Sequence, residues 1–213
     1  AVAAAAGVTV LGAVDGSIDI RDTADGSPRR RWNVAELGCP LATGNPIRVV
    51  DVRRDGSVLA AGYFDGSIVV IEDPLGEARV RCQSASGVVR GIAFDPRTGD
   101  VVATNGDDRL LVWSLQTDRV RLVTVATDTV NAVAFDPSGR IVATGAVNGD
   151  IALLDAASLR PIRQPFNGAQ VAVVDLAFSP RRSLLASAGV DGSVVLWNVD
   201  TGLELTEPIV VHA

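Results

Sequence analysis

Short apolar runs alternate with turn residues along the whole chain. Apolar runs bounded by Gly, Asn and Asp in this way are typical of β-strands. Five such turns occur along the chain. The positions six residues after the first residue of each turn are separated by 50, 42, 41 and 43 residues. The sequence therefore repeats one strand-rich unit with a period of about forty residues. The five turns are Asp15-Gly16, Asp65-Gly66, Asp107-Asp108, Asn148-Gly149 and Asp191-Gly192.

Each unit is predicted to hold four antiparallel strands. The third unit has an apolar inner strand at 89–94, a second strand at 100–104, a third ending at Trp113 and a polar fourth at 119–124. An Asp-Pro pair ends its inner strand, because proline lacks the N–H that strand pairing needs. The first unit is predicted to be truncated or degenerate. The same plan predicts further strands at 1–6, 49–52, 130–135, 140–144, 160–163, 173–178, 183–187 and 204–211.

The polarity of the strands predicts how they are placed. The inner strand is apolar along its length and needs cover on both faces, whereas the arginine-bearing fourth strand suits an outer edge. We therefore predict an all-β protein, a β-propeller of four-stranded antiparallel blades with five repeats. One domain is expected, because a single repeat cannot bury its own apolar face. The predicted repeats span about 1–45, 46–86, 87–127, 128–168 and 169–213.

The longer first spacing indicates an insertion of about eight residues within 27–45. It holds Arg29, Arg30 and Arg31, followed by Trp32 and Cys39. Insertions in repeat arrays map to surface loops, often on a functional face. We interpret this one as an ordinary surface loop, with a functional loop as the alternative.

Composition narrows the function classes. Hydrophobic residues make up 47% of the 213 residues, which is ample for a large core, and a net charge of −6 argues against nonspecific nucleic-acid binding. All 19 basic residues are Arg and Met is absent, so we expect a processed or excerpted piece encoded by a GC-rich bacterial genome. No uncharged apolar stretch approaches the ~20 residues of a membrane span. Cys39 and Cys82 lack metal-ligand spacing and are expected to be reduced, which fits a cytoplasmic location.

The stretch at 184–198, LLASAGVDGSVVLWN, resembles the core of a WD-repeat β-propeller blade. Residues 101–114 and 141–155 resemble it more weakly. In that family a histidine, a Ser or Thr, the turn Asp and a Trp form a buried hydrogen-bonded tetrad. The resemblance implies tetrad roles for Thr104, Asp107, Trp113, Ser187, Asp191 and Trp197, with Asp15, Asp65 and Asn148 in the corresponding turns.

The tetrad lacks its histidine in this chain. Ala85, Ala126 and Ala169 occupy the histidine position, and the sole histidine, His212, lies where a further repeat would begin. Each turn Asp is therefore expected to accept hydrogen bonds from N–H groups of its own turn or from water. Five repeats are fewer than the seven usual in the family. We favour a piece of a seven-bladed ring, covalently linked to an effector domain, over a closed five-bladed propeller.

Motifs for catalysis are lacking. A chain without Lys holds no phosphate-binding loop of the Walker type, and one histidine cannot build a His-based metal site or a nucleophile–base pair. We expect no cofactor, no metal and no enzymatic activity. The rival hypothesis is a hydrolase or lyase that uses the propeller channel, for which Asp51 and Asp175 are the candidate carboxylates.

Binding is the better hypothesis. The resemblance implies a noncatalytic protein–protein interaction scaffold or sensor, part of a larger bacterial regulatory or signalling protein. Its partner is expected to be a protein or peptide, not nucleic acid or membrane, and an assembly element that pairs through open blade edges is the alternative. Tyr63 and Phe64 stand out because aromatic and Arg residues dominate binding hot spots. The residues predicted on the binding face are Arg48, Tyr63, Phe64, Arg90, Asn105, Asn131, Val147 and Val190.

Arginine clusters offer a second candidate surface. They lie at 29–31, 53–54 and 181–182 and could hold an acidic or phosphorylated partner. We favour the interpretation that these arginines lie in ordinary solvated turns.

For Phe64, the alternative to an exposed position on the binding face is packing between blades.

Overall fold

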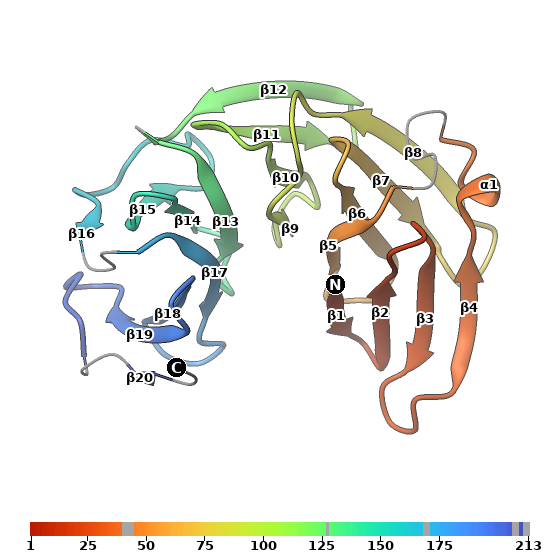
Figure 1. Cartoon of the computed structure of the whole chain (residues 1–213), viewed down its shortest axis with the longest axis horizontal. Coiled ribbons are helices and arrows are strands. Elements are labelled where there is room, and N and C mark those ends of the chain that lie inside the picture. Colours follow the sequence, from red (N-terminus) through yellow and green to blue (C-terminus); the bar gives the residue numbers. More distant parts are fainter. Residues whose placement is uncertain (40–44, 127, 168–170, 206–208, 211–213) are drawn as a thin grey trace. The chain divides into compact units, whose positions relative to one another are not determined.

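The computed structural model describes residues 1–39, 45–126, 128–167, 171–205 and 209–210, and is all-β apart from one short helix (Figure 1). Its strands form five antiparallel four-stranded sheets, in each of which the strands lie in sequence order. These sheets are the predicted blades of a β-propeller. The chain divides into two compact units, residues 1–94 and 95–213.

The first unit contains two complete sheets. Their orders are β1-β2-β3-β4 and β5-β6-β7-β8, and β9 follows them. The elements are β1 (Val2–Ala5), β2 (Val8–Gly12), β3 (Ile18–Asp22), β4 (Pro28–Trp32), α1 (Val34–Leu37), β5 (Ile47–Val52), β6 (Val58–Tyr63), β7 (Ser67–Glu72), β8 (Arg79–Ser84) and β9 (Ile92–Phe94).

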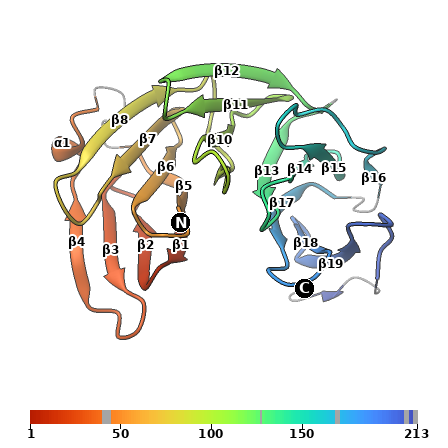
Figure 2. The same ribbon diagram turned by 180° about the vertical axis from the view of Figure 1, so that it is seen from behind.

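The second unit holds the remaining strands, shown from the other side in Figure 2. In it β13 and β17 coincide with the strands predicted at 130–135 and 173–178, and β12 coincides with 119–124. The strands are β10 (Val101–Thr104), β11 (Arg109–Ser114), β12 (Arg119–Thr124), β13 (Val130–Phe135), β14 (Ile141–Ala146), β15 (Asp150–Asp155), β16 (Phe166–Asn167), β17 (Val173–Phe178), β18 (Leu184–Gly189), β19 (Ser193–Asn198) and β20 (Ile209–Val210).

A side-chain oxygen closes the turn between the second and third strands of every sheet. In each turn it accepts the backbone N–H two residues further on, at 2.8–3.0 Å. Such Asx turns hold the backbone in the tight hairpin that the sheet needs. The donor–acceptor pairs are Ser17–Asp15, Ser67–Asp65, Arg109–Asp107, Asp150–Asn148 and Ser193–Asp191.

Glycine is required in the turn between β6 and β7. Gly66 has φ +90°, and a Cβ there would lie 2.6 Å from the carbonyl oxygen of Ala85. The same glycine accepts a hydrogen bond from the N–H of Ala85 at 2.8 Å. The turn therefore packs directly against the chain that leaves β8.

The two tryptophans assigned to tetrads make different hydrogen bonds. Trp197 donates from Nε1 to Ser187 Oγ at 2.9 Å inside the fifth sheet. Trp113, which is fully buried, donates instead to Asp118 Oδ1 at 3.0 Å. Thr104 is buried as well, at 0% exposure. The Ser187–Trp197 hydrogen bond is one that the resemblance to the family's tetrad implies. The indole N–H of Trp113 instead donates to Asp118 in the turn after β11. Ala169 and His212 lie outside the described residues.

Several predicted boundaries were wrong. The first repeat is neither truncated nor degenerate, because it forms the complete sheet β1 to β4. The arginines at 29–31 belong to strand β4 rather than to a loop. In the fourth sheet the outer strand is β16, not 160–163, where Pro161 allows only an isolated bridge to Leu154.

Helix α1 is the remaining departure from the predicted loop. The carboxylate of Glu36 accepts the N–H of Asn33 at 2.9 Å, which satisfies a free donor at the start of the helix. Gly38 ends the helix in the left-handed conformation with φ 60°. An Asn three residues before a Glu, with Gly two residues further on, was the available sequence signal. Residues 40–44 of the insertion lie outside the described residues.

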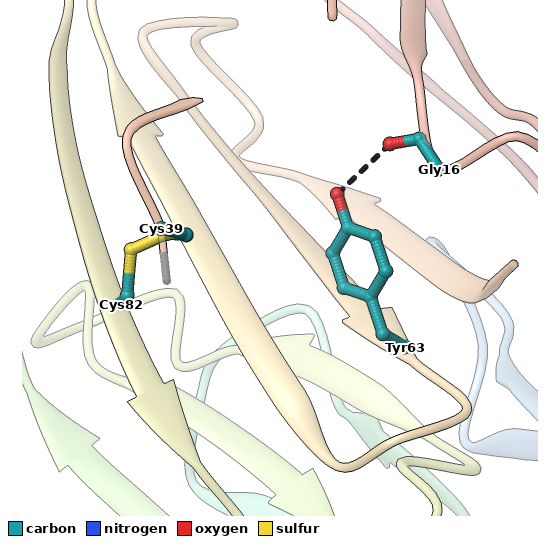
Figure 3. The surroundings of a disulfide bond; sticks show 4 residues. All are labelled: Gly16, Cys39, Tyr63 and Cys82. Carbon is teal, nitrogen blue, oxygen red and sulfur yellow. Dashed lines mark hydrogen bonds between the residues drawn. A yellow bond between two sulfur atoms is a disulfide. The ribbon is translucent and has the colours of Figure 1, made fainter. Parts of the chain in front are cut away.

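A disulfide joins this insertion to the second sheet (Figure 3). It connects Cys39, just after α1, to Cys82 on β8, with a Cα–Cα distance of 6.0 Å. The expectation of two reduced cysteines was therefore wrong, since spacing in the sequence does not report proximity across a sheet edge. Leu37 and Cys39 lie in one buried cluster with β2, β3, β6 and β7, against which Val80 and Cys82 also pack.

Loss of this disulfide should destabilise the protein. A Cys39→Ala/Cys82→Ala variant is expected to lose about 2–4 kcal/mol of unfolding free energy, because the cross-link restricts the unfolded chain. Urea unfolding followed by circular dichroism measures the loss. Reductant should lower the stability of the natural sequence to that of the variant and leave the variant unchanged. Equal stability of the natural sequence with and without reductant would contradict the assignment.

Candidate interaction surface

The turns between second and third strands carry exposed apolar side chains at equivalent positions. Each of these residues directly precedes the Asx residue that closes its turn. In the first unit Val14 is 80% and Phe64 46% exposed, and in the second unit Val147 is 41% and Val190 62% exposed. In the third sheet Gly106 stands at this position. Val14 was not predicted, although its place before Asp15 matches that of Phe64 before Asp65.

Phe64 is the largest of these side chains and has a cationic neighbour. The guanidinium of Arg48 lies 5.4 Å from the centroid of the Phe64 ring, within the range of a cation–π contact. Asn45 donates from Nδ2 to Asp65 Oδ2 at 2.8 Å, and Asp65 in turn closes the hairpin. Arg90, also in the first unit, is exposed. A rigid turn therefore presents an aromatic ring together with a positive charge to solvent.

Tyr63 was expected beside Phe64 on this surface, and that expectation needs correction. Its side chain is 0% exposed, and its hydroxyl donates to the carbonyl oxygen of Gly16 at 3.1 Å (Figure 3). Burial raises the pKa of the Tyr63 hydroxyl, and Asp65 adds to the shift. Tyr63 is the last residue of β6, which is buried along its whole length, whereas Phe64 lies in the turn that follows and is exposed.

Asn105 and Asn131 were also predicted on the binding face, but both side chains are buried. Their exposed fractions are 2% and 8%. Asn131 donates from Nδ2 to the carbonyl oxygen of Val173 at 3.0 Å, which links β13 to β17 within the second unit. Asn131 therefore serves the packing of β13 against β17, whereas Asn105 donates from Nδ2 to Asp107 Oδ2 at 3.3 Å within its own turn.

The predicted arginine clusters make contacts within the protein. Arg29 pairs with Asp22, Arg31 Nη2 lies 2.9 Å from Asp15 Oδ2, and the guanidinium of Arg30 lies 3.8 Å from the Trp32 ring centroid. Arg53 Nη2 likewise lies 2.8 Å from Asp55 Oδ2 in a turn of the second sheet. Arg182 uses its backbone N–H to contact Ser179 Oγ at 3.2 Å. For 29–31 and 53 a structural role accounts for the charge.

The two carboxylates proposed for catalysis accept backbone N–H groups. Asp51 accepts from Phe94 at 2.9 Å and from Val52 at 2.8 Å, and burial raises the pKa of its carboxyl group. Asp175 accepts from Leu176 at 2.8 Å. Asp51 therefore holds the chain of β9 against β5. Among the described residues no group of three or more His, Cys, Asp or Glu is placed to hold a metal ion.

The comparison with protein families gives a match to repeats described as "WD domain, G-beta repeat". The matched segments are residues 119–155 and 160–198, both in the second unit. They support the resemblance to the WD40 repeat family.

Within the described residues, the structure has no helix with the length and apolar character that a membrane span requires.

Three curated relatives extend the comparison. A "Periodic tryptophan protein 2 homolog" from Dictyostelium discoideum is 27% identical over 76% of this chain and 18% of its own length. A "Guanine nucleotide-binding protein subunit beta" from Solanum tuberosum is 27% identical over 57% of this chain and 34% of its own length. The human "WD repeat-containing protein 36" is 26% identical, over 72% of this chain and 17% of its own length. The chain thus spans about a third or less of each relative, and all three come from eukaryotes.

Substitution of Tyr63 should destabilise the fold. Tyr63→Ala is expected to cost about 3–5 kcal/mol because it leaves a cavity, and Tyr63→Phe about 1 kcal/mol for the lost hydrogen bond. Phe64→Ala is the matched control and should change the unfolding free energy by less than about 0.5 kcal/mol. Urea unfolding measures all three. A Tyr63→Ala protein as stable as Phe64→Ala would refute the buried position.

Stability should fall in acid as the turn carboxylates are protonated. Hydrogen bonds from Arg53, then from Ser57, lower the pKa of Asp55 well below its ordinary 3.8. Because the folded pKa is depressed, the contribution of Asp55 is complete above pH 3.8 and is lost as the pH falls below that value. Asp55→Asn should therefore flatten the pH dependence of the unfolding free energy below pH 3.8. Parallel pH profiles for the variant and the natural sequence would contradict this.

Proposed function

We propose that this chain is a noncatalytic protein–protein interaction module of the WD40 repeat family. It binds a protein or peptide through the turn surface, which consists of Phe64 in the turn between β6 and β7 and Arg48 on β5. The observation that carries the proposal is the exposed aromatic–cation pair of Phe64 and Arg48, held by an Asx turn. Rigid aromatic and Arg side chains lose little entropy on binding and dominate interface energetics.

The comparisons support this function because the relatives include a protein named as a subunit and a protein named for its WD repeats. The potato relative is named as a subunit, and its assembly role is extended to this chain as part of the proposal. The composition supports a bacterial source, and we place the module in a larger regulatory or signalling protein with a covalently linked effector domain.

The disulfide bears on location. Disulfides persist in oxidising compartments and are reduced in the cytosol. The Cys39–Cys82 bond therefore favours an oxidising compartment over the cytoplasm that the sequence suggested.

The test uses two charge substitutions at matched exposure. Phe64→Glu alters the turn surface, whereas Leu75→Glu, at a residue that is 42% exposed, alters the turn between β7 and β8 at the other end of the same sheet. Partners captured by the tagged chain from its source cells are identified, purified and titrated against both variants. We expect Phe64→Glu to weaken binding by tenfold or more, about 1.4 kcal/mol, with an unchanged melting temperature. Equal affinity of both variants would refute the proposed surface.

A further inference from the structure

Strand β12 is the exposed outer edge of the third sheet. It pairs with β11 on one side only, and the sheet order places it at the end (Figures 1 and 2). Five of its six residues are exposed, among them Val120 at 39% and Leu122 at 47%. Among the described residues no backbone group outside this sheet bonds to the backbone of β12. Its outward N–H and C=O groups can therefore pair with a further strand.

Strand β8 is the counterpart of β12 and shows how such a strand is covered. Both are six-residue outer strands that begin Arg-Val-Arg, and they pair with the third strand of their sheets in the same register. In that register Cys82 faces Val69 as Leu122 faces Leu111. The two strands can therefore be compared residue by residue.

The apolar face of β8 is covered from within the protein. Val80 and Cys82 pack against the buried cluster that contains Leu37 and Cys39, and the disulfide fixes this cover in place. The corresponding residues of β12 are Val120 and Leu122, which are exposed. No cysteine stands in β12, so no disulfide can hold a comparable segment there.

One arginine of β8, Arg81, has an acidic partner within its sheet, whereas the equivalent arginine of β12, Arg121, has none among the described residues. Arg81 Nη2 lies 3.0 Å from Glu72 Oε1 on the neighbouring strand β7. The position of Glu72 is taken by Ser114 in β11, so Arg121 lacks this acidic partner. Within the described part of the chain neither Arg119 nor Arg121 has an ion pair.

We propose that β12 binds an extended acidic peptide segment of another protein, which adds as a fifth strand to the sheet. Its acidic side chains would meet Arg119 and Arg121, and its alternate apolar side chains would cover Val120 and Leu122. A second copy of this chain fits less well, because the β12–β12 registers that keep Val120 and Leu122 of both copies on one face also place the arginines of both copies together on the other. Nucleic acid also fits less well, because two arginines on a chain of net charge −6 give little counterion release.

The test uses a fluorescent octapeptide that alternates glutamate and valine, with a lysine–valine octapeptide as control. Fluorescence anisotropy should show saturable binding of the acidic peptide alone. Arg119→Glu should weaken it about tenfold or more, while the matched control Arg79→Glu, at the equivalent position of β8, should not. Leu122→Glu should also weaken it, and the melting temperature reports that each variant is folded.

Two further arms separate the mode and the site of binding. A peptide N-methylated at every amide cannot pair as a strand and should lose binding. Phe64→Glu should leave binding of the octapeptide unchanged, so failure at β12 is distinguishable from failure of the turn surface. No binding by the acidic peptide, equal losses in Arg119→Glu and Arg79→Glu, or undiminished binding of the N-methylated peptide would overturn the proposal. A dimer that Leu122→Glu dissociates would assign β12 to self-association instead.

Discussion

The hydrogen bond that an Asx side-chain oxygen accepts from the N–H two residues further on is the interaction on which each blade depends. It closes the hairpin between the second and third strands and thereby sets their register. A slip of one residue would turn every inward side chain toward solvent. The residue before each Asx lies in the turn, beyond the end of the second strand, and Val14, Phe64, Val147 and Val190 are exposed at that position.

The blades share their inner construction and differ at their outer strands. The first sheet ends in β4, whose arginines are paired with Asp22 and Asp15, and the second ends in β8, which the disulfide covers. In the fourth and fifth sheets the described outer strands have only two residues each. Among the described outer strands β12 alone is long, exposed and without these protections. Repetition therefore supplies the internal comparison that singles it out.

Much of the fold could be predicted from the sequence, because apolar runs and turn residues are local signals. The strands at 119–124, 130–135 and 173–178 were predicted to the residue. Features that depend on distant partners were missed. The segment that forms β4 was predicted to be a loop. Its three arginines contact Asp22, Asp15 and Trp32, and these contacts cannot be read from the local sequence pattern.

The candidate site was predicted less well than the fold, for the same reason. Both adjacent aromatics were predicted on the binding face. Phe64 is exposed, whereas Tyr63 is buried and its hydroxyl donates to Gly16 in the neighbouring sheet. Of the polar residues predicted on the binding face, Arg48 and Arg90 are exposed, whereas Asn105 and Asn131 are buried. A turn position can be read from sequence, but burial depends on which sheet lies beside it.

The disulfide has a consequence for the covalent continuity of the first unit. It closes a loop between residues that are 43 positions apart, and strands β5, β6 and β7 lie inside that loop. A protease cut anywhere in this interval would leave two peptides joined through sulfur. The second blade can thus be nicked without release of either fragment, and electrophoresis would show the cut only after reduction.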